Sequence, residues 1–236
     1  MMRLQKYLAL AGVASRRNAE KMIADGRISV NSHIVSEMGI QVDETCDIIE
    51  VDGCPVSIQE EKHYLAYNKP VGEITTVSDP EGRATVMDKF RDYPVRLYPV
   101  GRLDYDSEGL LLLTNDGDMM NHVLHPSHEV KKVYLTKVSN QVTDEEIRSL
   151  RRGVMIDGRL TSPASVRIIR HETFDTVLLI SIHEGRNRQV RKMIAAIGHQ
   201  VVNLRRVEFG PVMLGDLPLG RWRHLTESEI RKLKEL

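Results

Sequence analysis

The polar stretch of residues 59–62 separates two parts of the chain whose apolar residues recur with different periods. Before this stretch, apolar residues recur mainly at helical spacing; after it, short apolar runs are bounded by Gly, Asn and Pro, which is typical of strands. The first part is too short to bury the core of an enzyme by itself. We therefore expect a small domain over residues 1–58 and a larger domain over residues 63–236.

The small domain is expected to begin with two short helices. Apolar residues at helical spacing predict a helix over residues 4–11, and Ser15 is a suitable N-cap for a second helix that ends at Gly26. Residues 27–30 alternate in the manner of a strand, and residues 31–32 form a turn that reverses the chain. The pattern predicts two helices followed by small strands.

The larger domain is expected to be of the α+β class, with a mixed, mainly antiparallel sheet and flanking helices. Thr143 and Thr226 each precede a glutamate by three residues, as in a capping box, and Asn187 can cap a third helix. Residues 68–70 are expected to break the first strand of the sheet. The predicted strands cover residues 64–67, 95–100, 110–114, 133–138, 166–169 and 177–182.

Basic residues are concentrated in two segments, although the chain carries 33 basic and 33 acidic residues and has no net charge. A net charge of zero argues against a nucleic-acid partner, but RNA responds to the local field of a surface rather than to the sum over the molecule. Residues 34–60 contain no Lys or Arg, which sharpens the contrast. The basic segments contain Arg16, Arg17, Lys21 and Arg27, and then Arg186, Arg188, Arg191, Lys192, Arg205 and Arg206.

Several common classes of protein are not supported by the motifs of the chain. Gly-rich phosphate-binding loops are absent from the sequence, and Asn187 stands where the second histidine of a zinc-binding helix would be required. Metal-dependent, nucleotide-binding and serine-hydrolase functions therefore have little support. The sequence has no apolar run of membrane length, no signal core and only two cysteines, so we expect a cytoplasmic protein.

Two charged segments are poorly explained by ordinary packing. Residues 101–110 place four charged residues in a loop between two apolar strands, although a solvated connection would have the same composition. In residues 183–193, arginines crowd the first turn of a helix and oppose the helix macrodipole. An anionic partner, such as a carboxylate or a phosphate, would offset that cost, while a solvated basic face is the simpler interpretation.

These segments and several others resemble sequence blocks of the bacterial ribosomal RNA pseudouridine synthases, in the same order along the chain. Residues 3 to about 50 resemble the small RNA-binding domain named after ribosomal protein S4. The other blocks are similar to the catalytic domain, most of all to that of the large-subunit enzymes of the B type. These blocks are Asn68-Lys69-Pro70, Gly101-Arg102-Leu103-Asp104 with residues 109–117, Lys132-Val133-Tyr134, residues 184–191 and Gly198-His199.

The resemblance implies an RNA-modifying enzyme that isomerises a uridine to pseudouridine and needs no metal or organic cofactor. Asp104 matches the family's nucleophile, and Arg191 matches the arginine that forms an ion pair with it; attack on the sugar carbon or on the uracil ring is left open. Tyr134 matches the tyrosine that packs on the target base, and Leu204 matches an apolar residue of the base pocket. Spacing alone does not distinguish these roles from simpler ones, in which Tyr134 is an ordinary strand aromatic and Leu204 is a core leucine.

Further residues are expected to bind the RNA substrate. Arg102, Arg186 and Arg188 are expected to contact the backbone around a nucleotide that is flipped out of the RNA. For Arg102, filling the gap that this nucleotide leaves in the RNA is the alternative. Lys69 is expected to shape the rim of the pocket beside the substrate. The residues of the first domain that are expected to bind phosphates are Arg16, Arg17, Lys21 and Arg27.

The partner that the resemblance implies is ribosomal RNA, either free or in a ribosomal assembly intermediate, and the expected substrate is the 23S rRNA. The alternatives are a 16S rRNA enzyme of the same family and a non-catalytic rRNA-binding assembly factor. Asp104 favours an enzyme, because a pure RNA binder has no use for a carboxylate that faces phosphates. The chain is expected to act as a monomer.

Overall fold

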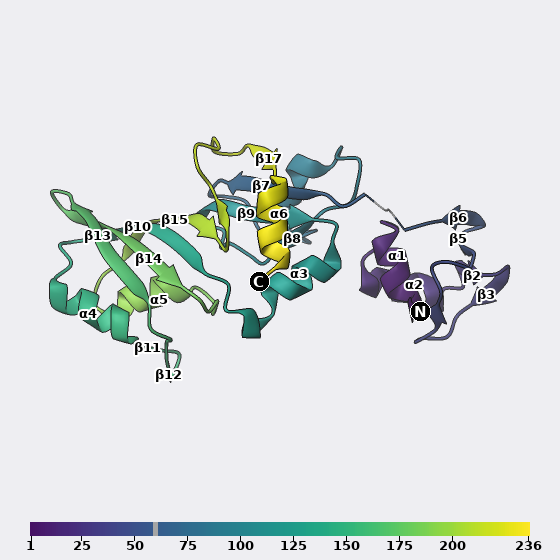
Figure 1. The fold of residues 1–236 in the computed structure, drawn as a ribbon, viewed down its shortest axis with the longest axis horizontal. Coiled ribbons are helices and arrows are strands. Elements are labelled where there is room, and N and C mark those ends of the chain that lie inside the picture. Colours follow the sequence, from purple (N-terminus) through teal and green to yellow (C-terminus); the bar gives the residue numbers. More distant parts are fainter. Residues whose placement is uncertain (59–60) are drawn as a thin grey trace. The chain divides into compact units, whose positions relative to one another are not determined.

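The computed structural model describes residues 1–58 and 61–236, and these form two compact units (Figure 1). The first unit contains Met1–His63 together with two short segments, Tyr93–Arg96 and Asn115–Gly117, and the second contains the rest of the chain. Within the described residues, no helix is both long enough and apolar enough to span a membrane. Within the described residues, the first unit is built around one buried apolar cluster and the second around two.

Two short helices open the first unit, as the sequence predicts. They are α1 (Leu4–Leu10) and α2 (Arg16–Ala24). The hydroxyl of Ser15 accepts a hydrogen bond from the backbone N–H of Asn18 at 3.2 Å, so it caps α2 as predicted. Both helices contribute apolar side chains to one core, which includes Leu4, Leu8, Ala19, Ile23 and Ile28.

The rest of the first unit is built from short strands. They are β1 (Met2–Arg3), which pairs with β4 (Gln41–Val42), and a sheet in the order β3 (His33–Val35), β2 (Ile28–Val30), β5 (Ile49–Val51) and β6 (Cys54–Val56). Asn31 and Ser32 both have positive φ angles, 51° and 66°, as a tight turn between β2 and β3 requires. The boundary suggested at residues 59–62 follows this sheet, and its first two residues lie outside the described part of the chain.

A nine-stranded sheet forms the centre of the second unit, in the order β13-β14-β10-β15-β9-β7-β17, with β16 added to β15 and β8 added to β9. Its strands are β7 (Tyr64–Lys69), β8 (Tyr98–Val100), β9 (Glu108–Thr114), β10 (Lys132–Ser139), β13 (Ser165–His171), β14 (Asp175–Ile182), β15 (Val201–Phe209), β16 (Val212–Met213) and β17 (Trp222–His224). Only β9 and β15 pair in parallel; the other pairs of this sheet are antiparallel. The predicted mixed, mainly antiparallel sheet is confirmed.

Helices cover the two halves of this sheet separately (Figure 1). Helices α4 (Asp144–Arg152) and α5 (Gln189–Ala196) pack on the half that contains β13 and β14, around a core that includes Leu150, Leu178 and Met193. Helices α3 (Gly117–Leu124) and α6 (Glu227–Lys234) pack on the half that contains β7 and β9. The capping boxes predicted at Thr143 and Thr226 are both present. A small hairpin, β11 (Met155–Ile156) and β12 (Arg159–Leu160), and two 3₁₀ turns, Val86–Phe90 and Pro126–His128, complete the unit.

Several local predictions are wrong. The N-cap of α5 is Arg188, which has a left-handed φ of 51°, and not Asn187. Strand β7 continues through Asn68 and Lys69, where the sequence suggests a break, and the strand suggested over residues 95–100 is limited to Tyr98–Val100. Neither β15 nor α3 is predicted, because charged residues interrupt the apolar pattern of β15 and α3 begins at an Asn-Asp-Gly segment that looks like a turn.

Gly109 allows the parallel contact between β9 and β15. Its φ angle is +105°, and a Cβ atom at this position would lie 2.3 Å from the carbonyl oxygen of Arg206. We expect Gly109→Ala to lower the free energy of unfolding by about 3 kcal/mol or more, since both the backbone conformation and the steric contact oppose the methyl group. Urea unfolding measures this change. Gly117→Ala is the control, because its added methyl meets no atom within 4 Å; equal stability of the two variants would contradict the prediction.

Candidate active site

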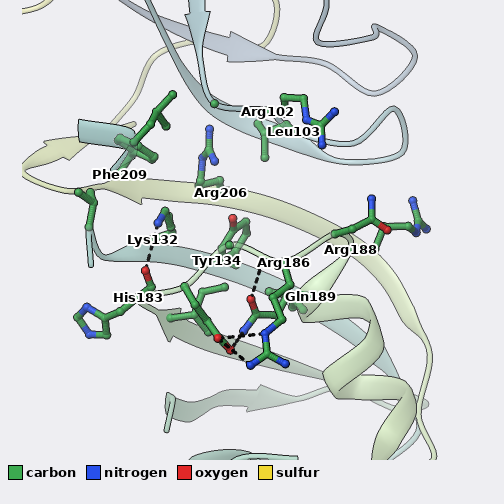
Figure 2. Close-up of a pocket in the computed structure, with 18 of the residues that line it drawn as sticks. Arg102, Leu103, Lys132, Tyr134, His183, Arg186, Arg188, Gln189, Arg206 and Phe209 are labelled. Atoms are coloured by element: carbon green, nitrogen blue, oxygen red, sulfur yellow. Dashed lines mark hydrogen bonds and ion pairs between the residues drawn. The ribbon is translucent and has the colours of Figure 1, made fainter. Parts of the chain in front are cut away.

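A cleft of about 790 Å³ opens in the second unit between the two cores of its sheet. This volume lies within the range of sites that bind small molecules or single nucleotides. Strands β10 and β15 form the floor of the cleft, the loop between β8 and β9 forms one wall, and the segment from β14 into α5 forms another (Figure 2). The charged segments at residues 101–110 and 183–193, which are far apart in the sequence, therefore face the same space.

The loop between β8 and β9 carries Asp104 into the cleft. The side chain of Asp104 is about one third exposed, with a relative accessibility of 33%. The loop is held by its own backbone, because the N–H of Ser107 donates to the carbonyl of Asp104 at 3.1 Å. Thr75 holds the preceding residue, since its hydroxyl donates to the carbonyl of Leu103 at 2.7 Å and accepts from the N–H of Leu103 at 3.2 Å. Asp104 is thus an accessible carboxylate on a fixed backbone.

Lys69 supports the same loop from the core. Its side chain is fully buried, and its ammonium group donates to the carbonyl oxygens of Pro70 at 2.9 Å, Asp104 at 3.1 Å and Ser107 at 2.8 Å. Burial lowers the pKa of Lys69 to about 8, although carboxylates nearby, that of Glu73 foremost, favour the charged form. The expectation that Lys69 meets the substrate at the pocket rim is therefore wrong, because Lys69 lies behind the wall that it holds.

The ion pairs at this wall differ from the predicted one. Arg188 binds Asp106 through two hydrogen bonds, of 3.0 and 2.7 Å, and its Nη1 lies 3.9 Å from Oδ2 of Asp104. Arg191 also pairs with Asp106, at 3.3 Å, and donates to the backbone carbonyl of Asp106 at 2.7 Å. The predicted partner of Asp104, Arg191, is thus engaged by Asp106, and Arg188 is the arginine in contact with Asp104.

Asp106 supplies the anionic partner that the start of α5 requires. Its hydrogen bonds from Arg188, together with the nearby charge of Arg191, hold the pKa of Asp106 below its ordinary value. The arginines at the helix N-terminus oppose the macrodipole, and a carboxylate at this end offsets that effect. In this structure the partner is therefore a carboxylate of the neighbouring loop.

Arg186 and Gln189 complete the wall that leads into α5. Arg186 forms an ion pair with Glu184 at 3.2 Å and donates to the carbonyl of Leu160 at 2.8 Å. The side chain of Gln189 accepts from the backbone N–H of Arg186 at 2.9 Å and donates to Glu184 (Figure 2). These contacts fix the backbone of the wall and leave the guanidinium of Arg188 as its most exposed charge, with a relative accessibility of 42%.

Tyr134 and Leu204 both line the cleft, on the adjacent strands β10 and β15, where Tyr134 is opposite Arg206 and Leu204 is opposite Thr136. Tyr134 is on β10 next to a bulge in the pairing of β10 with β15, and bulges of this kind re-aim side chains at functional sites. Leu204 is buried, with 5% exposure, and provides an apolar surface. Arg102 is exposed at the mouth, on the same loop as Asp104 (Figure 2). An aromatic ring, an apolar side chain and a carboxylate therefore border one nucleotide-sized space.

The floor also contains residues that the sequence did not single out for this role. Lys132, Arg206 and Phe209 all line the cleft. A usable signal was present for Lys132, since in a strand it shares a face with Tyr134, two residues later. The corresponding signal for Arg206 is its position two residues after Leu204, but it is usable only once β15 is recognised as a strand, which the sequence pattern does not predict.

The basic residues predicted to bind RNA in the first unit lie on its surface. Arg16, Arg17 and Lys21 are exposed on α2, and none of the three has an ion pair with another described residue. Arg27 is also exposed, but its guanidinium is bound to Asp52, with an Nε–Oδ1 distance of 3.0 Å. Three of the four cations are therefore available to an external anion, and the fourth is already paired.

Comparison with known proteins agrees with these two units. The family described as RNA pseudouridylate synthase matches residues 63–196, and the S4 domain matches residues 2–49. The chain belongs to the RNA pseudouridylate synthase family. It is an RNA pseudouridine synthase, which is an isomerase, with an S4 RNA-binding domain at its N-terminus.

Relatives of this pseudouridine synthase match over nearly the whole chain. The ribosomal large subunit pseudouridine synthase B of Bacillus subtilis is 44% identical, over 100% of this chain and 97% of that protein. An uncharacterised RNA pseudouridine synthase of Aquifex aeolicus is 43% identical, over 98% of this chain and 93% of its own length. A crystal structure of a pseudouridylate synthase superposes with a TM-score of 0.71 at 34% identity, covering 99% of this chain and 100% of the other.

Proposed function

We propose that this synthase isomerises one uridine of the large-subunit ribosomal RNA in the cytoplasm, with Asp104 as its nucleophile. The observation that carries the proposal is the position of Asp104, an accessible carboxylate on a pinned loop that lines the same nucleotide-sized cleft as Tyr134. A carboxylate is suited to this role because it can form a covalent bond and leave again.

The reaction is an isomerisation, so the substrate and the product contain the same atoms. The bond between the ribose C1′ and N1 of uracil breaks, the detached base turns, and C1′ is joined to C5. N1 gains a proton and C5 loses one. Asp104 forms a bond, at C1′ or at the uracil ring, that is broken again before the product leaves, so that the free carboxylate is regenerated.

The other cleft residues bind and orient the substrate in this proposal. Tyr134 packs on the uracil ring and Leu204 supports it, since both border the space in front of Asp104. Arg102 and Arg188, at the mouth, contact the RNA backbone and help to offset the cost of flipping the nucleotide out of its stack. Arg188 also places a positive charge next to Asp104, while Arg191 acts indirectly by holding Asp106.

The large-subunit substrate is proposed from the names of relatives. Those of Bacillus subtilis, Vibrio cholerae and Pseudomonas aeruginosa are called ribosomal large subunit pseudouridine synthase B, at 44%, 39% and 42% identity. Pseudouridine mapping of rRNA from cells that lack this chain tests the proposal. We expect loss of a single pseudouridine from 23S rRNA and its return with the wild-type gene; loss from 16S rRNA, or no loss, would contradict it.

The first unit is proposed to hold the RNA through phosphates. We expect the triple variant Arg16→Gln, Arg17→Gln, Lys21→Gln to bind rRNA fragments more weakly and to reduce the slope of log Kd against log salt by roughly 2, or about 0.7–0.9 per lost phosphate contact. Arg27→Gln is the control, because Arg27 is already bound to Asp52. Equal salt slopes for the triple variant and the wild type would remove this role from α2.

A further inference from the structure

Two cations on the floor of the cleft have no counter-ion among the described residues. Lys132 and Arg206 lie on adjacent strands, where Lys132 is opposite Phe209 and Tyr134 is opposite Arg206. All four residues line the cleft, so their side chains share one face of the sheet. Both charges lie near the ring of Phe209, whose centroid is 5.9 Å from Nζ of Lys132 and 5.0 Å from Cζ of Arg206.

The surroundings of Arg206 leave its charge unsatisfied. The residue is 3% exposed, its Nε donates to the carbonyl of Leu110 at 2.7 Å, and its Nη2 is buried without a hydrogen-bond partner in the described part of the chain. A buried guanidinium of this kind is costly unless an acceptor or an anion satisfies it. Figure 2 shows Arg206 extending from β15 toward the loop that carries Arg102 and Leu103, that is, across the cleft.

Lys132 is in a similar position. Within the described residues, its Nζ donates a single long hydrogen bond, 3.3 Å, to the carbonyl of His183 (Figure 2). Burial, together with the like charge of Arg206, lowers the pKa of Lys132 below its ordinary value. Neither cation forms an ion pair with a described carboxylate, whereas Asp104 and Glu184, which also line the cleft, are paired with Arg188 and Arg186.

We infer that Lys132 and Arg206 form a phosphate subsite, which binds the backbone phosphate on one side of the flipped uridine. This inference rests on the proposed function and adds to it the group that fixes the nucleotide at the floor. Two cations on a rigid sheet match a phosphate, which accepts several charge-assisted hydrogen bonds at once. The phosphate would give Arg206 the acceptor that it lacks and would separate two like charges. Its position beside Tyr134 would place the attached ribose in front of Asp104.

Neutral linkages in the RNA test this inference. The probe is a hairpin of rRNA that contains the uridine identified by mapping, with a methylphosphonate either 5′ or 3′ of that uridine. For the wild type, we expect one of the two linkages to raise Kd about tenfold, since it removes a charge-assisted contact. For Lys132→Gln, we expect natural RNA to bind about tenfold more weakly and the same methylphosphonate to change Kd less than about twofold. Fluorescence anisotropy measures each Kd.

Controls separate this subsite from general charge effects. Lys131→Gln removes the same charge from the neighbouring residue, which pairs with Glu208 instead, and it should keep the full response to the methylphosphonate. Lys132→Arg and Arg206→Lys each keep a cation at the subsite, so both should keep most of the response to the methylphosphonate. Thermal unfolding checks that each variant is folded. The subsite would be overturned if the loss of affinity caused by Lys132→Gln and the loss caused by the methylphosphonate were additive at both linkages. Because binding and pseudouridine formation are measured separately, a chain that shows the response but makes no pseudouridine would instead defeat the proposed function.

Discussion

Asp104→Asn is expected to lower pseudouridine formation by at least about 10⁴-fold, because the amide nitrogen and oxygen cannot replace a carboxylate as a nucleophile that leaves again. The fold should tolerate the change. Asp104 is one third exposed, and its contact with Arg188 is long, 3.9 Å, so the pair contributes less than about 1 kcal/mol to stability. A single-turnover assay with the mapped RNA measures the loss, and urea unfolding measures the stability.

Asp106→Asn is the matched control for this prediction. It makes the same chemical change two residues away, in the same loop, at a carboxylate that binds Arg188 and Arg191. We expect Asp106→Asn to cost more stability than Asp104→Asn and to keep measurable activity, since it loosens the arginines but spares the nucleophile. The reverse order of activities, or more than about 1% residual turnover in Asp104→Asn, would show that Asp104 has been assigned the wrong role.

Local patterns in the sequence predicted most of the fold because they depend on neighbours along the chain. The capping boxes at Thr143 and Thr226 and the N-cap at Ser15 are each set within a few residues, and all three are present. The missed strand β15 shows the limit of this approach. It supplies Leu204 and Arg206 to the cleft, and its charged and polar residues, of which Arg206 lines the cleft, disguise its strand pattern.

The ion pairs could not be predicted, because they depend on how a loop faces a helix. Asp104 and Asp106 are both in the loop between β8 and β9, and no periodicity decides which of them meets Arg191. The conformation of the loop brings Asp106 to Arg191 and leaves Asp104 toward the cleft. The resemblance identified the correct segments as neighbours, and the structure assigned the partners.

Burial of a charged residue is equally hidden from sequence reasoning. Lys69 precedes a proline, and lysines are almost never fully buried unless paired, so a surface position was the natural expectation. The structure places its ammonium group under the loop, where three carbonyl oxygens of that loop and its neighbour need a donor. A lysine supplies three N–H donors from one atom, which explains why this residue type fits the position.

Lys69→Met is expected to destabilise the protein by about 2–4 kcal/mol at pH 7 and to lower kcat/KM by roughly 10²-fold. Methionine fills a similar volume but leaves the carbonyls of Pro70, Asp104 and Ser107 without a donor, at a cost of about 1–3 kcal/mol each, partly offset by removal of a buried charge. The loss of activity follows from the loop, since small displacements of a reacting group cost about this much. Lys131→Met, at an exposed ion pair, is the control and should behave like the wild type.

The pH dependence of stability distinguishes a buried ammonium group from a simple packing residue. The pKa of Lys69 is about 8 in the folded chain and 10.5 in its ordinary state, so between these values the unfolded chain binds more protons than the folded chain. Stability of the wild type should therefore rise with pH from about 8 to about 10.5, by up to about 3 kcal/mol, and Lys69→Met should lack this rise. Urea unfolding of both proteins at several pH values between 7 and 10.5 measures the difference. A stability gap that stays constant or narrows as pH rises would mean that Lys69 is not the buried ammonium group that holds the loop of Asp104.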